Sequence, residues 1–93
     1  MILDIVSPEA KLFSGEVTSV TLPGVDGSFQ ILNNHAPIVS ILEKGTIKIA
    51  SAKFNFSKEV ASKFTKVNDQ TYTLEIASGT VEMKDNKVIV LVD

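Results

Sequence analysis

The regular spacing of turn-forming residues is the feature that most constrains how this chain can fold. Glycine, proline and one Asp-Asn pair divide the sequence into segments of about five to eight residues, the usual length of strands. These breaks fall at Pro8, Gly15, Pro23-Gly24, Gly27, Pro37, Gly45, Gly79 and Asp85-Asn86. Residues branched at Cβ dominate the segments, which favours strands over helices. The chain is therefore expected to be all-β.

Apolar and polar residues alternate in the last third of the chain, as they do in half-buried strands. The alternation is clear in Thr71–Ala77 and continues through Thr80–Lys84. Together with Lys87–Val92, these segments predict a meander of three strands. Tight hairpin turns are expected at Ser78-Gly79 and at Asp85-Asn86.

Upstream segments of similar length are also predicted to be strands. They are Ile2–Val6, Val17–Leu22, Ser28–Leu32, Ile38–Leu42 and Thr46–Ala50. Roughly eight strands in so short a chain predict a small β-sandwich or flattened barrel. A chain of 93 residues has room for one hydrophobic core, so we expect one domain over residues 1–93.

One stretch departs from the strand pattern. Its apolar residues fall at positions i, i+4, i+8 and i+11, the spacing of one helix face; they are Phe56, Val60, Phe64 and Val67. We expect one short helix near residues 57–67, capped by Ser57 and supported by a Glu59–Lys63 pair. A two-stranded excursion fits the same stretch nearly as well.

Composition excludes several classes of function. All nine basic residues are lysines, so the chain has no guanidinium for bidentate recognition of phosphates or base edges, and no nucleic acid partner is expected. There is no cysteine and a single histidine, His35, so we expect no metal site, no cofactor and no catalytic residues. The longest apolar run, Val88–Val92, is far shorter than a membrane-spanning helix, and no secretory signal is evident, so an intracellular protein is expected.

Two predicted strands are apolar on both faces. Val88–Val92 has no polar residue at all, and Ile38–Leu42 has only one. We expect the opposite sheet, together with a loop or the Phe54–Val67 stretch, to cover both faces. A permanent protein–protein interface is the alternative.

The order and spacing of five motifs over residues 3–49 resemble the epsilon subunit of the rotary F-type ATP synthase. The motifs are Leu3–Glu9, Leu12–Val17, Leu22-Pro23-Gly24 with Gly27–Leu32, Asn34–Val39 and Lys44–Ile49. Ser78–Met83 and Asn86–Leu91 resemble the closing hairpin of the same amino-terminal domain. The resemblance implies a β-sandwich of about ten strands.

The resemblance also implies a role. In this family the sandwich is a non-catalytic part of the rotating central stalk: one face packs on the gamma subunit, and turns at one end rest on the c-ring. Alpha and beta subunits belong to the same complex, which couples ion transport to ATP synthesis. The chain is then peripheral to the cytoplasmic face of the bacterial inner membrane. The alternative is a generic β-sandwich module that binds a peptide or carbohydrate.

Carried onto this sequence, the resemblance assigns two sets of contact residues. The turns facing the c-ring are those of Asp26, Ser28 and His35, although relatives often have an acidic side chain at the position of Ser28. The gamma-facing residues are Ile38, Ile41, Val88 and Val90.

The chain departs from the family at two places. Many members continue into a carboxy-terminal helical hairpin, whereas this sequence stops at Asp93, either as a naturally short subunit or as a fragment. Residues 50–69 form a longer connection than usual. The phenylalanines in it, Phe54, Phe56 and Phe64, are expected either to cover an open sheet edge or to contact a neighbouring subunit.

Overall fold

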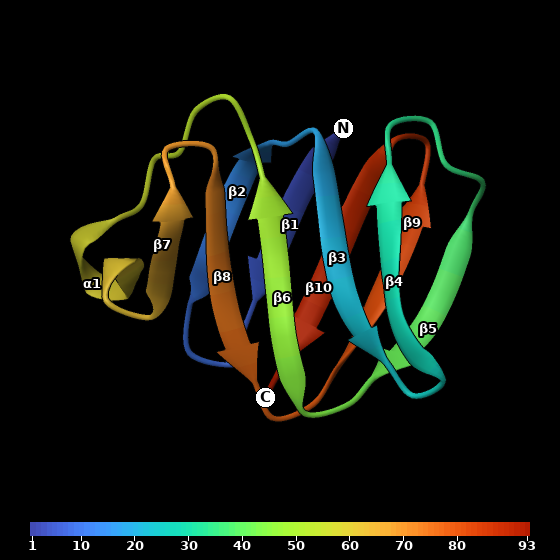
Figure 1. The fold of residues 1–93 in the computed structure, drawn as a ribbon. Helices are drawn as coiled ribbons and strands as arrows, with labels where there is room; N and C mark the ends of the chain where they lie inside the picture. The colour runs from blue at the N-terminus through green and yellow to red at the C-terminus, as the bar shows by residue number, and fades with distance from the viewer.

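Ten β-strands and one short helix make up the computed structural model, which describes residues 1–93 (Figure 1). The elements are β1 (Ile2–Val6), β2 (Lys11–Glu16), β3 (Ser19–Gly24), β4 (Gly27–Leu32), β5 (Ile38–Leu42), β6 (Gly45–Ala50), α1 (Lys58–Ala61), β7 (Phe64–Asn68), β8 (Thr71–Ile76), β9 (Gly79–Lys84) and β10 (Lys87–Val92).

The strands form two facing layers. The order β2-β1-β10-β9-β5 makes the back layer in Figure 1, and β4-β3-β6-β8-β7 makes the front layer. A single pairing, Gly24 with Leu42, joins β3 to β5, so one continuous sheet curls over on that side. Neighbouring strands are antiparallel except β1 and β10. The predicted all-β sandwich is confirmed.

The core lies between the two layers and contains 21 buried apolar residues. Strand alternation places them there because successive side chains point to opposite faces. In β8, for example, Leu74 and Ile76 are buried while Glu75 between them is exposed. The alternation read from the sequence thus identifies the inward side of this strand correctly.

Two of the predicted turns are hairpins in the structure. Asp85 and Asn86 join β9 to β10 with φ angles of 52° and 60°, the left-handed geometry that two-residue hairpins need and that Asp and Asn tolerate. Val25-Asp26 joins β3 to β4, and Gly27 follows with a φ of 119°. Both hairpins therefore depend on turn residues that tolerate positive φ angles.

The predicted meander is wrong at its first turn. β8 pairs with β6 and β7, whereas β9 pairs with β5 and β10, so Ala77-Ser78 carries the chain from one layer to the other. Gly79 makes this crossing possible because a Cβ there would lie 2.4 Å from the backbone oxygen of Leu91. A turn signal alone does not distinguish such a corner from a hairpin.

The expected helix is present but shorter than predicted. It covers only Lys58–Ala61, and the following residues form strand β7 at the edge of the front layer. Ser57 occupies the N-cap position without a capping side-chain hydrogen bond. The expected Glu59–Lys63 ion pair is absent. The helical spacing identifies two buried residues correctly, but only one of them lies on a helix: Val60 is in α1 and Phe64 is in β7.

An aromatic cluster closes the side of the sandwich between β2 and β7, the two ends of the strand order. Its members are Phe13, Phe54, Phe56, Phe64 and Tyr72. Phe56 is in contact with all the others, with ring centroids 4.4 Å from Phe64 and 4.9 Å from Tyr72. Of the two uses considered for the long 50–69 stretch, its phenylalanines cover the open side of the fold.

Candidate docking face and end turns

One exposed face of the sandwich is rich in apolar side chains. The pairing of β5 with β9 and of β9 with β10 places Val39, Glu82 and Ile89 in one row, and Ile41, Thr80 and Leu91 in the next. We call these six residues the outer face. Val39 is 78% exposed, Ile41 64% and Leu91 52%, whereas their neighbours along each strand are half-buried or buried. The pattern is that of a sheet face with no covering layer.

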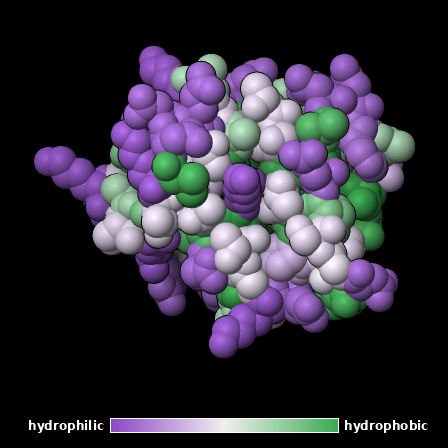
Figure 2. All heavy atoms as spheres, in the orientation of Figure 1, coloured by the Kyte–Doolittle hydropathy of each residue, from purple (hydrophilic) through white to green (hydrophobic).

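The opposite side of the molecule is different. Figure 2 shows the front layer, where hydrophilic and intermediate side chains dominate and apolar ones are scattered. On β6 and β8 the exposed side chains include Thr46, Lys48 and Glu75. Soluble proteins seldom leave a contiguous apolar face open to water, so the outer face is the better candidate for a docking surface.

A groove of about 460 Å³ continues the outer face toward one end of the molecule. Val6, Ile41 and Leu91 contribute apolar walls, and the end of the chain at Asp93 lies beside it. The hydroxyl of Ser78 donates a hydrogen bond to the Asp93 carboxylate, which fixes this rim. The groove can receive an apolar side chain from a docked partner.

The structure corrects part of the predicted gamma-facing set. Ile41 lies on the outer face and Ile38 is half-buried against the core, but Val88 and Val90 are fully buried and have no surface to offer. In β10 the outward side chains are those of Lys87, Ile89 and Leu91. All five residues from Val88 to Val92 are apolar, but the strand begins at Lys87, whose charge marks the outward side. Alternation from Lys87 places Ile89 and Leu91 outward and Val88 and Val90 inward, as the structure shows.

Sequence reasoning missed Val39, Glu82, Ile89 and Leu91 as individual members of the outer face. A signal was available for β5, because residues two apart share a face of a strand. Val39 and Ile41 therefore belong together, and Ile38 and Ile41 cannot face the same side. The same signal existed for β10, because Ile89 and Leu91 lie two and four residues after the charged Lys87.

The two predicted c-ring turns lie at opposite ends of the molecule. Asp26 and Ser28 are exposed where β4 begins, and His35 is exposed in the loop after β4 ends (Figure 1). A six-residue strand separates its ends by roughly 17–20 Å. The expectation that all three residues share one end is therefore wrong.

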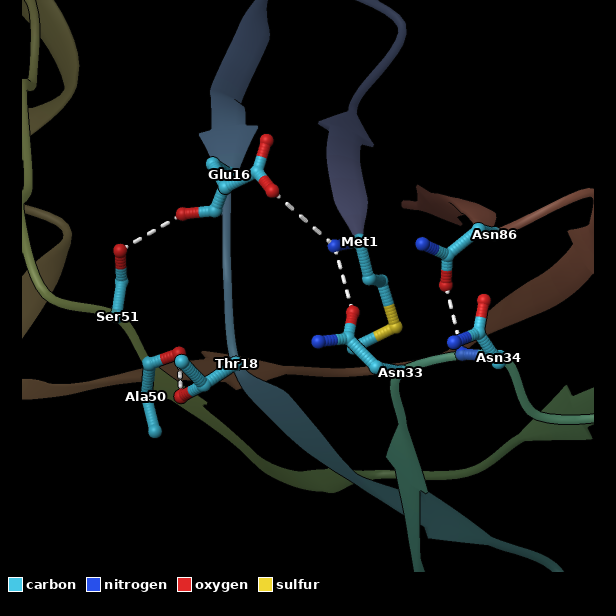
Figure 3. Close-up of polar contacts among 8 residues, drawn as sticks. All are labelled: Met1, Glu16, Thr18, Asn33, Asn34, Ala50, Ser51 and Asn86. Atoms are coloured by element: carbon cyan, nitrogen blue, oxygen red, sulfur yellow. Dashed lines mark hydrogen bonds and ion pairs between the residues drawn. The ribbon is translucent and has the colours of Figure 1, made fainter.

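The loop of His35 is held by a polar network, shown in Figure 3. The amino group of Met1 donates to Asn33 Oδ1 at 2.7 Å and lies 3.4 Å from Glu16 Oε1. The backbone N–H of Asn34 donates to Asn86 Oδ1 at 2.8 Å. These contacts tie the loop to β1, to the end of β2 and to the β9–β10 hairpin, so this end of the sandwich is cross-linked by hydrogen bonds.

Little in the structure resembles a chemical centre. No group of three or more His, Cys, Asp or Glu side chains is placed to hold a metal ion. Lys66 Nζ lies 2.9 Å from Asp69 Oδ1, and this hydrogen bond lowers the pKa of Asp69 and raises that of Lys66. Lys66 is exposed on β7 and Asp69 on the β7–β8 turn, both away from the outer face. No helix has the length and apolar character needed to cross a membrane.

Comparison with known families decides what kind of domain this is. The model of the ATP synthase delta/epsilon chain β-sandwich domain matches residues 1–93. The chain belongs to this family. The resemblance drawn from the sequence motifs is thereby confirmed, and the epsilon chain is a non-catalytic subunit of ATP synthase.

Similar epsilon chains cover almost the whole sequence. The ATP synthase epsilon chain of Chlorobium limicola is 37% identical over 91 residues, which are 98% of this chain and 86% of that protein. The epsilon chain of Desulforamulus reducens is 36% identical over 91 residues but extends further, so the aligned region is 57% of its length. The sandwich is thus shared by relatives of different length.

Two solved structures with the same fold are those of mitochondrial ATP synthases. A chain in the Tetrahymena thermophila central stalk and c-ring structure superposes with a TM-score of 0.67 at 17% identity, covering 98% of this chain and 61% of that chain. A chain in the Euglena gracilis OSCP, F1 and c-ring structure gives 0.77 at 16% identity, covering 99% and 49%. At these identities the likeness establishes the fold.

Proposed function

We propose that this epsilon-family chain is a rotor subunit that links the gamma subunit to the c-ring and so helps couple ion transport to ATP synthesis. It acts as one rigid sandwich domain over residues 1–93. The observation that carries the proposal is the uncovered apolar outer face of β5, β9 and β10. A rotating part needs a lasting attachment, and lasting interfaces are large and apolar. The structures with the same fold belong to complexes described as central stalk, F1 and c-ring.

The gamma subunit is the occupant that we assign to the outer face. Val39, Ile41 and Leu91 supply exposed apolar area, and the groove beside Ile41 and Leu91 offers a place for an inserted side chain. Ile38 supports the face from below as part of the packing against the core. Val88 and Val90 support the outer face in the same way from the core, and they do not contact the gamma subunit.

The end of the sandwich at the β3–β4 hairpin is the part that we assign to the c-ring. Asp26 and Ser28 are exposed there, and Val25 beside them is 54% exposed. His35 leaves this set because it lies at the other end of β4. Through these contacts the chain is peripheral to the membrane, at the cytoplasmic face of the bacterial inner membrane, with alpha and beta subunits in the same complex.

Affinity purification tests the assembly. The tagged chain is purified from membranes of its own cells in mild detergent, and bound proteins are identified by mass spectrometry. We expect gamma, alpha, beta and c subunits with the wild type and with Val67→Asp, because Val67 is 57% exposed on β7, away from the outer face. Leu91→Asp, on the outer face, should lose them. Recovery of none by a folded wild-type bait would refute the proposal and favour a peptide- or carbohydrate-binding module.

Cross-linking tests the orientation. The chain contains no cysteine, so Ser28→Cys and His35→Cys each create one labelling site for a photoactivatable maleimide. In the assembled synthase, Ser28→Cys should give a product with the c subunit. His35→Cys is the matched control from the other end and should not. The reverse result would mean that the molecule stands on the ring the other way up.

A further inference from the structure

Glu82 is an unpaired charge on the outer face, between its apolar side chains and the exposed pair of Lys84 and Lys87 on the next row of β9 and β10. In the β5–β9–β10 register its direct neighbours are Val39 on one side and Ile89 on the other. The row on the other side, one step along the strands, consists of Ile41, Thr80 and Leu91. Glu82 is exposed and takes part in none of the three ion pairs of the structure.

The other acidic side chain near this face is already neutralised. Asp4 of β1 pairs with Ile89 in the register. Its carboxylate accepts a hydrogen bond from Ser14 Oγ at 2.6 Å and lies 3.6 Å from Lys87 Nζ. Asp4 therefore carries its own partners into an interface, whereas Glu82 does not.

Covering the outer face would remove water from Glu82. A carboxylate that loses its hydration without gaining a cation or hydrogen-bond donors is strongly destabilised. A purely apolar partner surface, or an acidic one, would therefore be rejected at this point even where it fitted Val39, Ile41 and Leu91. Charge placement of this kind sets specificity more than bulk affinity.

We propose that the gamma-subunit surface covering the outer face carries a lysine or arginine side chain opposite Glu82, surrounded by apolar side chains. This inference rests on the proposed attachment to gamma and adds the chemistry of that attachment. Glu82 is then the residue that selects the partner, and the apolar residues around it exclude water from the pair. Excluding water strengthens the ion pair because the local dielectric constant falls.

Two lysines of the chain lie on the same face beside Glu82. Lys87 of β10 is diagonal to it but lies 3.6 Å from the Asp4 carboxylate, so Lys84 is the competing partner that remains. It lies two residues further along β9 on the same side, about 7 Å away. It makes no ion pair with Glu82 in the structure. If Lys84 swung over on docking, the partner would need no cation, so the test has to separate the two residues.

The experiment measures binding of fluorescently labelled chain to the synthase catalytic core of the same organism, containing gamma but depleted of epsilon, at low and high salt. We expect Glu82→Gln to weaken binding ~10–100-fold, the usual cost of losing a charged hydrogen bond, and to reduce the salt dependence. Glu75→Gln makes the same charge change on the front layer and should leave binding unchanged. Lys84→Gln should also leave it unchanged.

Each other outcome has a distinct meaning. Glu82→Gln binding as well as or better than wild type would overturn the inference, and so would an equal loss for Lys84→Gln. If Leu91→Asp abolishes binding while Glu82→Gln does not weaken it, the outer face is the docking surface but the gamma subunit has no cation opposite Glu82. If neither variant weakens binding, or the folded wild type does not bind, the proposed attachment falls as well. Thermal unfolding of each variant verifies that it is folded.

Discussion

Replacing Phe56 with alanine removes the residue that connects the whole aromatic cluster. Its ring contacts four others, at centroid distances of 5.8 Å from Phe13, 5.6 Å from Phe54, 4.4 Å from Phe64 and 4.9 Å from Tyr72. These residues come from β2, the 50–69 stretch, β7 and β8. The substitution therefore loosens the contact that closes the sandwich between its two sheet edges.

The size of the effect follows from burial. A fully buried phenylalanine costs about 3–5 kcal/mol when truncated to alanine, but Phe56 is only partly buried against the core. About half of that value, roughly 2 kcal/mol, is the expected loss in the free energy of unfolding. For a chain of this length, it corresponds to a fall in Tm of about 8–16 °C.

Urea and thermal unfolding followed by circular dichroism measure the loss. Val67→Ala is the control, since an exposed side chain on β7 should change stability by less than about 0.5 kcal/mol. Binding to the gamma-containing core at low temperature should be unchanged, because Phe56 is not part of the outer face. A stability loss for Phe56→Ala no larger than that of the control, together with weakened binding, would mean that the long stretch is a subunit contact instead.

Four further substitutions, at three positions, probe the turns and the Lys66–Asp69 pair. Gly79→Ala places a Cβ 2.4 Å from a β10 backbone oxygen and should destabilise the fold by about 1–3 kcal/mol in urea unfolding; an unchanged midpoint would show that the corner can relax. Asn86→Gly should cost only the hydrogen bond to the Asn34 backbone, about 1 kcal/mol, and Asn86→Ala should cost more, because its φ is 60°. By NMR titration the pKa of Asp69 should lie below its ordinary value and rise in Lys66→Ala; the pair's stabilisation is present above the unfolded-state pKa and is lost as pH falls through the lowered one.

Much of this fold could be predicted from short stretches of sequence. The turn at Asp85-Asn86 was predictable because its geometry depends on two residues that tolerate positive φ. The inward side of β8 was predictable because the apolar Leu74 and Ile76 alternate with the polar Thr73 and Glu75. The separation of Ser28 from His35 was also available, since the predicted strand between them is long enough to put them at opposite ends.

Other features were beyond local inference. The chain passes from β8 to the other layer instead of turning back, and β1 lies parallel to β10, more than eighty residues away in the sequence. Of the four residues with helical spacing, Phe56, Val60 and Phe64 lie in or against the core, but a helix supplies only Val60. The fourth, Val67, is exposed on β7. In each case contacts distant in sequence outweighed the local preference.

The sequence by itself determined the kind of domain and the positions of its turns. Turn geometry and strand alternation depend on a few neighbouring residues, and the family motifs are equally short stretches of sequence. The tertiary structure alone decided which surface is available for docking. Alternation from Lys87 predicts which side chains of β10 point outward. Only the assembled sheet shows that this outward side has no covering layer and that Ile89 and Leu91 lie on it with Glu82 and Val39.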